Sequence, residues 1–203
     1  MEPDQGDKAI TVTRDNVREA LAAVGVVSAD TTLIHSSLSS MGTVIGGAHA
    51  VIDGCLDAVG PEGTVAAPTL WWYDADPPLR REDWNIETSP SYVGAISETL
   101  RLRAGSIRSD HPTHSVSGLG FRAAELARDH GAYGLRPCPW GWDAFAVSSP
   151  WQHLYDWDAA ICFIGVDLRV GTMRHFAEAV FTQARLDHAP TPEGEHGGRS
   201  ALM

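Results

Sequence analysis

Apolar residues recur along the chain in two spacings, which predict helices and short buried strands in alternation. Val17, Ala20, Leu21 and Val24 follow the i, i+3, i+4, i+7 spacing of one helix face, and Gly25 stands where a helix commonly ends. Short uninterrupted apolar runs instead predict strands that are buried on both faces. The predicted strands are 31–35, 64–69, 116–119 and 160–166, and the predicted helices are 15–24, 47–59, 90–100, 121–129, 149–157 and 172–186.

This alternation predicts an α/β fold with a central mixed sheet and helices on both sides. Residues 1–188 are expected to form a single domain whose first twelve residues are loose, and residues 189–203 to form a disordered tail. Ligand-binding loops of such sheets follow the carboxyl ends of the strands. The turns that begin at Ser36, Thr69 and Asp167 are therefore the candidate functional loops.

Composition narrows the functional classes. The 203 residues carry 15 basic and 26 acidic side chains, a net charge of −11, which repels nucleic acid and favours a cationic partner. No apolar run approaches the roughly 20 residues of a membrane span, and the first residues do not form a signal peptide. Cys55, Cys138 and Cys162 show no C-x-x-C spacing, which favours a reducing, cytoplasmic setting without disulfides.

The last predicted helix carries the first candidate for catalysis. His175 and Glu178 lie three residues apart near its start, so they share one helix face, and Thr172 is the predicted N-cap. A histidine beside a carboxylate at the end of a core strand can act as a general base. The same spacing is also common between paired side chains on a helix surface, and a metal site would need further ligands.

Three loops carry further candidate groups. The serine-rich stretch from His35 to Gly47 suits either an anion site or an ordinary capped loop, and it lacks the spacing of a P-loop or a dinucleotide fingerprint. Ser36 is not in a G-x-S-x-G elbow. The aromatic loop of residues 70–89 either lines a ligand pocket or covers the core. In a proline turn, Asp110 and His114 are spaced to pair, but histidines beside a turn are more often structural hydrogen-bonders.

The order of these motifs resembles that of the aminoglycoside 3-N-acetyltransferase family, whose members acetylate antibiotics with acetyl-CoA. The resemblance runs from about Val17 to Gln183. Seven anchors in one order are more specific than any single motif. The anchors are 35–42 (HSSLSSMG), 60–64 (GPEGT) with 68–69 (PT), 88–98 (TSPSYVGAISE), 108–115 (RSDHPTHS), 149–151 (SPW), 164–166 (IGV) and 173–178 (MRHFAE).

This resemblance implies an acyltransferase that uses acetyl-CoA, and no metal, in direct transfer to an amine. The expected acceptor is a small cationic amine, the 3-amino group of a 2-deoxystreptamine aminoglycoside or a related amine, so that an antibiotic is resisted or modified. His175 matches the family's catalytic base position and Glu178 its acidic partner. The residues implied in acetyl-CoA binding are His35, Ser36, Ser37, Leu38, Ser39, Val44, Gly46, Gly47, Thr69 and Ser115, and those implied in substrate binding are Trp71, Asp74, Tyr92, Asp167 and Glu178.

Two departures from the family pattern lie where the acceptor amine is expected to bind. The chain is expected to be short at its C-terminus, and residues 134–147 read as extra material before 149–151 (SPW). The alternative function is therefore a degenerate, non-catalytic CoA-binding protein, and a further alternative is a metal-dependent hydrolase that uses His111, His114, His175 and Glu178. The chain is expected to be a monomer or a homodimer.

Overall fold

The computed structural model describes residues 5–71 and 80–188, which form a layered α/β fold around a five-stranded sheet. The strand order in this sheet is β5-β6-β4-β2-β7. A two-stranded sheet of β1 and β3 lies apart from it. The strands are β1 (Thr11–Val12), β2 (Thr31–Ser36), β3 (Thr43–Val44), β4 (Thr64–Pro68), β5 (Ile107–Arg108), β6 (Val116–Gly120) and β7 (Ala160–Ile164).

The sheet is mixed, as the sequence predicted. β2 pairs in parallel with β4 on one side and with β7 on the other, and its register places Leu33 opposite Ala66 and Ile161. β6 pairs antiparallel with both β4 and β5. Because β2, β4 and β7 run the same way, the loops that follow them leave the sheet at one edge, where α/β proteins bind ligands.

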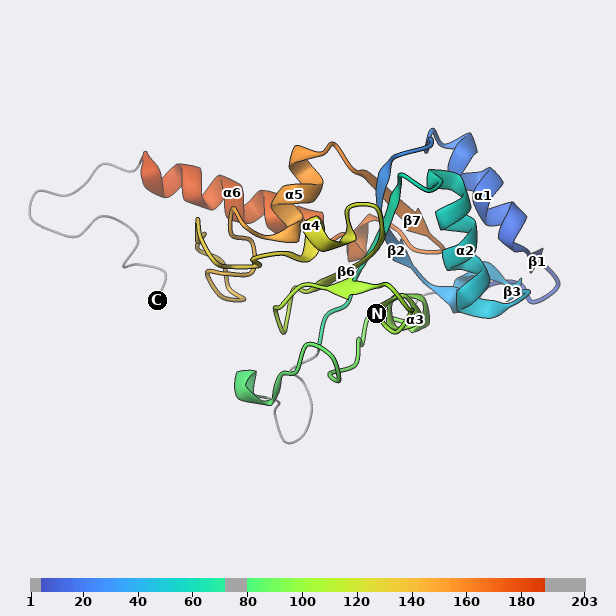
Figure 1. Cartoon of the computed structure of the whole chain (residues 1–203), viewed down its shortest axis with the longest axis horizontal. Coiled ribbons are helices and arrows are strands. Elements are labelled where there is room, and N and C mark those ends of the chain that lie inside the picture. The colour runs from blue at the N-terminus through green and yellow to red at the C-terminus, as the bar shows by residue number, and fades with distance from the viewer. Residues whose placement is uncertain (1–4, 72–79, 189–203) are drawn as a thin grey trace, which may run out of the picture.

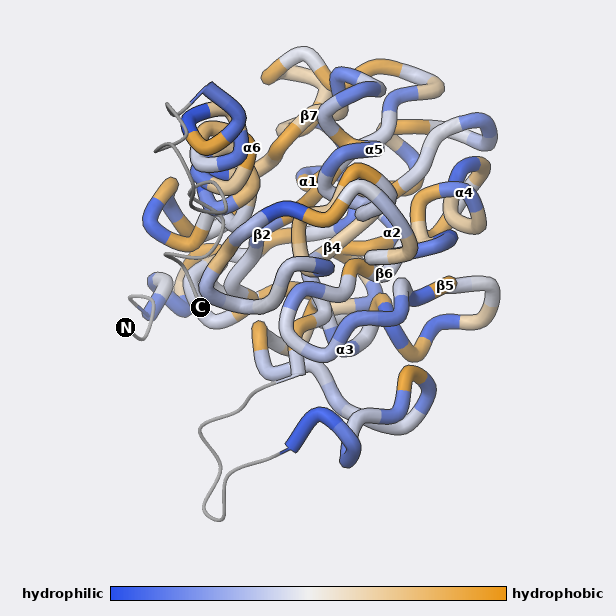
Figure 2. Tube along the Cα trace, turned by 90° about the vertical axis from the view of Figure 1, so that its left-hand side faces the viewer, coloured by the Kyte–Doolittle hydropathy of each residue, from blue (hydrophilic) through white to orange (hydrophobic). Residues whose placement is uncertain are grey.

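Helices cover both faces of the sheet, which confirms the predicted layers (Figure 1). One core cluster packs α1, α2 and α3 against Ile34, Val65 and Cys162, and a second packs α4, α5 and α6 against Leu33 and Ala66. β7 is hydrophobic along its length, whereas β2 carries its apolar residues Leu33 and Ile34 in the middle, between polar residues (Figure 2). The helices are α1 (Arg14–Ala23), α2 (Gly47–Val59), α3 (Ala95–Arg101), α4 (Ala123–Ala127), α5 (Pro150–Asp156) and α6 (Met173–Asp187), with 3-10 turns η1 (Leu38–Met41), η2 (Arg81–Asp83) and η3 (Leu168–Val170).

Local signals explain where two helices begin. Thr13 caps α1: its side chain accepts from the Asn16 N–H, and the Asn16 side chain accepts from the Thr13 N–H in return. Ser149 caps α5 without such a return bond, since its side chain accepts from the Gln152 N–H, and Pro150 occupies the first helical position, where its missing N–H costs nothing. The predicted start of α5 is therefore confirmed.

One predicted helix start was wrong and another was confirmed. Pro90 does not open a helix, since α3 begins at Ala95 after Gly94 at φ 115°, and the Tyr92 N–H donates to the Leu70 carbonyl, which ties this segment to the end of β4. Thr172 occupies the N-cap position as predicted, because α6 begins at Met173 and the Thr172 carbonyl accepts from the His175 N–H, although the Thr172 side chain makes no capping hydrogen bond.

Two further expectations need correction or fall outside the described residues. The start of the chain is not loose throughout, because the Gly6 N–H donates to the Ser39 carbonyl at 2.8 Å and β1 pairs with β3. The predicted tail, 189–203, lies outside the described residues. Among the helices that the structure does describe, none has the length and apolar character that crossing a membrane requires.

Shortening one side chain of the central strand tests the layered core. Leu33, in β2, is completely buried against the helices of the second cluster, so Leu33→Ala is expected to lower the free energy of unfolding by about 2–5 kcal/mol. The matched control is Leu168→Ala, the same truncation at a side chain that is 75% exposed, which is expected to change it by less than about 0.5 kcal/mol. Urea unfolding measures both, and equal effects would contradict this core assignment.

Candidate active site

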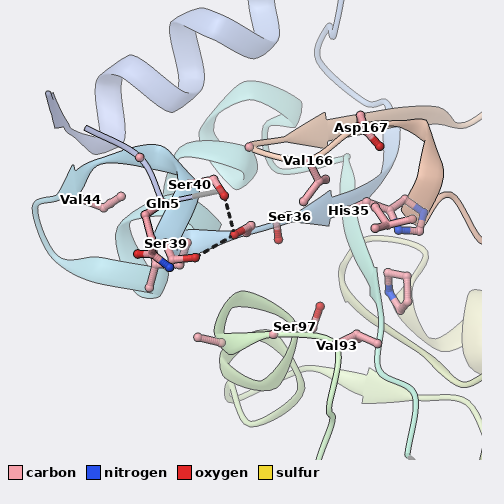
Figure 3. Close-up of a pocket in the computed structure, with 18 of the residues that line it drawn as sticks. Gln5, His35, Ser36, Ser39, Ser40, Val44, Val93, Ser97, Val166 and Asp167 are labelled. Atoms are coloured by element: carbon pink, nitrogen blue, oxygen red, sulfur yellow. Dashed lines mark hydrogen bonds between the residues drawn. The ribbon is translucent and has the colours of Figure 1, made fainter. Parts of the chain in front are cut away.

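A pocket of about 1420 Å³ opens at the sheet edge where β2, β4 and β7 end. We call it the serine cleft, because the turn after β2 supplies most of its hydroxyls (Figure 3). Residues from α3, from the loop after β7 and from the start of the chain complete its walls. The residues predicted to bind acetyl-CoA or substrate that line it are His35, Ser36, Ser37, Leu38, Ser39, Val44, Gly47, Tyr92 and Asp167.

Hydrogen bonds between serines shape this cleft. Ser37 Oγ lies 3.1 Å from Ser39 Oγ and 2.9 Å from Ser40 Oγ, so the hydroxyl before η1 contacts two hydroxyls within it. Ser36, from the end of β2, and Ser97, from α3, point toward one another across the cleft (Figure 3). Uncharged hydroxyls therefore line this part of the cleft.

Two buried polar atoms at the cleft have no partner. Ser36 Oγ and His35 Nε2 are enclosed and make no hydrogen bond to the described residues. The His35 ring stacks on Phe163 at 5.2 Å between centroids, and burial lowers the pKa of His35 to about 4, so the ring is neutral at pH 7. Enclosed polar atoms without partners are costly, and a bound polar ligand would satisfy them.

The start of α2 adds hydrogen-bond donors beside the cleft. Its N-cap is Gly46, at φ 83°, and no side chain caps the first turn. The first amides of a helix lack intrahelical partners and carry the positive end of the helix dipole, which suits an anion such as a phosphate. Gly47 lines the cleft, whereas Gly46 lies just outside its lining.

Thr69 and Ser115 lie behind the cleft wall and line neither of the two pockets described here. Both are buried, and Ser115 Oγ donates to the Thr69 carbonyl at 2.8 Å. Arg108 donates to the same carbonyl, to the Ser89 carbonyl at 2.5 Å and to Ser115 Oγ at 3.2 Å. Burial lowers the pKa of Arg108 to about 9. The geometry thus gives Thr69 and Ser115 a place in the scaffold that holds the end of β4.

A second pocket of about 670 Å³ adjoins the serine cleft, and we call it the histidine pocket. It contains His114 and His175 together with Trp71 and Trp140. Both pockets are lined by Leu70, Arg169, Val170 and Thr172, so the two spaces meet along these four residues. A long ligand in the serine cleft can therefore present one end to His175.

The predicted pair His175 and Glu178 is formed in the structure. His175 Nδ1 lies 2.8 Å from Glu178 Oε2 on the first turns of α6, so Nδ1–H donates to the carboxylate. Among the described residues Nε2 has no hydrogen-bond partner, and it is the nitrogen left for a ligand. The His175 side chain is 28% exposed and Glu178 is 58% exposed, and Trp140 packs against the imidazole at 4.5 Å.

The residues predicted to bind substrate do not all lie in one pocket. Trp71 lines the histidine pocket, while Tyr92 and Asp167 line the serine cleft. Glu178 lines neither pocket and acts on the site through His175. Asp74 lies outside the described residues.

A group that the sequence did not identify supports the histidine pocket from behind. Asp110 and His114 do not pair, because Asp110 accepts from the Trp84 indole at 2.8 Å, and the histidines of this turn are structural hydrogen-bonders, as the sequence favoured. Instead His111 Nε2 donates to Asp143 at 3.2 Å, and Arg81 binds the other oxygen of that carboxylate. These hydrogen bonds hold the pKa of Asp143 well below its usual range.

Asp143 and Trp140 both come from residues 134–147, which the sequence marks only as extra material. The richness of this loop in glycine and tryptophan was the available signal, and no spacing links it to the turn at His111. A metal centre is not formed there: within residues 5–71 and 80–188, no group of three or more His, Cys, Asp or Glu side chains converges as metal ligands. The Nε2 of His111 is instead bonded to Asp143.

A family model described as aminoglycoside 3-N-acetyltransferase matches residues 33–199. Aminoglycoside N(3)-acetyltransferase VIII from Streptomyces fradiae is 34% identical over 185 residues, which cover 83% of this chain and 61% of that protein. The chain therefore spans about 61% of the length of this curated relative.

Two solved structures share the fold over the same region. The crystal structure of aminoglycoside acetyltransferase AAC(3)-Xa aligns with a TM-score of 0.72 at 34% identity, covering 85% of this chain and 63% of that one. The binary complex of AAC-IIIb with CoASH aligns with a TM-score of 0.72 at 26% identity, covering 83% of this chain and 65% of the other.

Buried neutral histidines make the stability of this site depend on pH. Burial lowers the pKa of both His114 and His130 from 6.5 to about 3. Between pH 6.5 and pH 3 the unfolded chain therefore binds more protons than the folded chain, so stability falls as the pH drops below 6.5, by up to about 1.4 kcal/mol per pH unit for each group. The depressed pKa of Asp143 acts in the same direction below pH 3.8, its ordinary value.

His130→Gln isolates one of these contributions. His130 Nε2 donates to the Ala144 carbonyl at 3.1 Å, and an amide nitrogen in its place keeps a donor without a titrating ring. The variant is expected to lose stability less steeply than the wild type between pH 6.5 and 4.5 in urea unfolding. His49→Gln, at an exposed position of α2, is the control and should keep the wild-type slope. An unchanged slope in His130→Gln would refute the assignment.

Proposed function

Because the chain belongs to the aminoglycoside 3-N-acetyltransferase family, we propose that it transfers an acetyl group from acetyl-CoA to an amine, with His175 as the general base. The observation that carries this proposal is the arrangement at the sheet edge. His175, held by Glu178 at 2.8 Å, faces a pocket that adjoins a long serine-lined cleft. That combination suits a donor with a long arm whose reactive end meets a base.

The residues of the serine cleft fit coenzyme A. The unpartnered Ser36 Oγ and His35 Nε2 can bond the polar amides of its thin arm, and the uncapped first turn of α2 suits its phosphates. Small side chains from Ser36 to Ser40 leave room for that arm beside the backbone. The related AAC-IIIb, which shares the fold over this region, was solved with CoASH bound, which supports the same use here.

His175 is placed to remove the proton that the reaction releases. When acetyl-CoA is bound, the acceptor nitrogen forms a bond to the acetyl carbon, the C–S bond breaks, and the thiolate takes the bonding electron pair. The nitrogen proton passes to His175 Nε2, and Glu178, which accepts from Nδ1–H, favours the imidazolium that results. Trp140 packs on the same ring and shields one face of it from water.

The acceptor is proposed to be the 3-amino group of a 2-deoxystreptamine aminoglycoside or a related cationic amine. The family name supports this class, and the net charge of −11 draws a cation toward the protein. Asp167 at the rim of the serine cleft and Glu178 beside His175 supply acidic groups near the junction of the two pockets. Trp71 and Tyr92 add aromatic surface against which a sugar ring can pack.

Removing the imidazole tests this function most simply. His175→Ala is expected to lower kcat for acetyl transfer by at least 10²-fold, because a positioned general base contributes about 10²–10⁴. Thiol release from acetyl-CoA with a panel of aminoglycosides measures it, and calorimetry should show that CoA still binds. His188→Ala, at the far end of α6, is the matched control and should retain full activity. A wild type that binds CoA and acetylates no amine would instead support the non-catalytic CoA-binding alternative.

Glu178→Gln separates two effects of Glu178 on His175: orientation of the ring and stabilisation of its positive charge. The amide oxygen can still accept from His175 Nδ1–H, but the negative charge that favours the imidazolium is lost. Since Glu178 is 58% exposed and solvent screens it, we expect a moderate fall in kcat, on the order of 10-fold, with little change in the KM for acetyl-CoA. Steady-state kinetics measure kcat and the KM for acetyl-CoA in the variant and the wild type. A loss as large as that of His175→Ala would mean that Glu178 does more than orient and polarise the ring.

A further inference from the structure

The histidine pocket contains a second imidazole, His114, whose role the proposed transfer leaves open. His114 is 4% exposed and lines the same pocket as His175. Trp140 packs on both rings, at 5.1 Å from the centroid of His114 and 4.5 Å from that of His175. The two histidines therefore line one pocket and contact the same tryptophan.

A chain of hydrogen bonds indicates which nitrogen of His114 carries the proton. His111 Nδ1 accepts from the main-chain N–H groups of Thr113 at 3.2 Å and His114 at 3.1 Å, so the His111 proton is on Nε2, which donates to Asp143. Thr113 Oγ1 lies 2.9 Å from His114 Nδ1 and 3.3 Å from His111 Nδ1. Because His111 Nδ1 already accepts twice, we assign the Thr113 hydroxyl as the donor to His114 Nδ1. With this assignment, a neutral His114 carries its proton on Nε2.

The environment keeps that ring neutral and fixed. Burial first, and then the nearby His111, His130 and His175, lower the pKa of His114 to about 3, while Asp143 acts weakly in the opposite direction. Phe145 packs on the ring at 4.7 Å, and the His114 carbonyl accepts from the Trp151 indole at 2.9 Å. The imidazole therefore cannot turn without breaking several contacts.

The Nε2–H of His114 has no acceptor among the residues that the structure describes. It is also not enclosed: the fully buried side-chain atoms without a partner in this part of the chain are Thr32 Oγ1, His35 Nε2, Ser36 Oγ, Ser91 Oγ and Arg103 Nη1. Since His114 lines the pocket and its Nδ1 is used by Thr113, the free Nε2–H reaches the pocket.

We propose that His114 donates a hydrogen bond from Nε2 to the carbonyl oxygen of the acetyl group during transfer. This inference rests on the proposed function and adds to it a donor for the negative charge that the oxygen gains as the acceptor nitrogen bonds to the acetyl carbon. When the C–S bond breaks, the C=O bond re-forms and the charge leaves with the thiolate. A fixed neutral donor is effective here because it needs no reorganisation, and it takes no proton from His175.

The first test uses the wild-type protein and needs no turnover. Nitrogen-15 NMR of protein labelled at histidine should show His114 neutral, with its proton on Nε2, at pH 7. Adding a ketone analogue of acetyl-CoA, which keeps the carbonyl and cannot transfer it, should shift the His114 Nε2–H resonance downfield, and CoA without an acyl group should not. A proton on Nδ1, or identical responses to both ligands, would overturn the proposal.

Two variants test the same group in catalysis. His114→Phe keeps the ring packing and removes the donor, so kcat should fall about 10²–10³-fold, as for loss of one oxyanion donor, while the KM for acetyl-CoA stays within a few-fold. His114→Gln restores an N–H and should recover part of that loss. Full activity in His114→Phe, or no recovery in a folded His114→Gln, would overturn the proposal. If wild-type protein acetylates no amine, the proposed function fails, and the NMR titration alone then tests whether His114 donates to the acyl carbonyl oxygen.

Discussion

The parallel pairing of β2 with both β4 and β7 is the constraint on which the site depends. It brings the turn after Ser36, the segment after Pro68 and the loop after Ile164 to one edge of the sheet, although the first and the last of these are more than a hundred residues apart in sequence. The register is fixed from both faces, because a slip of one residue would exchange Leu33 and Ile34 between the two hydrophobic layers. The two pockets are a consequence of that alignment.

The buried polar groups of the site fall into two sets. One set forms a scaffold of groups that hydrogen-bond to one another, and the other forms the working surface that faces the ligand pockets. Arg108, Thr69 and Ser115 satisfy one another behind the cleft, which fixes the end of β4 without exposing a charge. On the working surface, Ser36 and His35 keep unpartnered atoms that favour a polar ligand. The imidazole of His175 differs from the buried ones in being partly open to solvent and paired with a carboxylate, which suits a group that must gain and lose a proton in each cycle.

The sequence predicted the strands and the edge of the sheet, because burial on both faces leaves an apolar run that local pattern detects. It also placed His175 and Glu178 on one helix face, since a spacing of three is a local property. It missed the short β1, β3 and β5, which have two residues each, and it began α3 at Pro90 because a proline signal cannot reveal that Gly94 bends the chain. It favoured a structural role for the histidines of the proline turn but could not name their partners, because the contacts of His111 with Asp143 and of Trp140 with His114 and His175 join segments that only the fold brings together.

The central claim is that the serine cleft and the histidine pocket form one continuous site for an acyl donor. A crystal structure of the full chain with coenzyme A tests it most directly. The account predicts that the arm follows residues 36–44, that its phosphates lie at the start of α2, and that the sulfur atom lies where Leu70, Val170 and Thr172 join the two pockets, within reach of His175. Coenzyme A bound elsewhere, or bound in the cleft with its sulfur directed away from His175, would contradict the account.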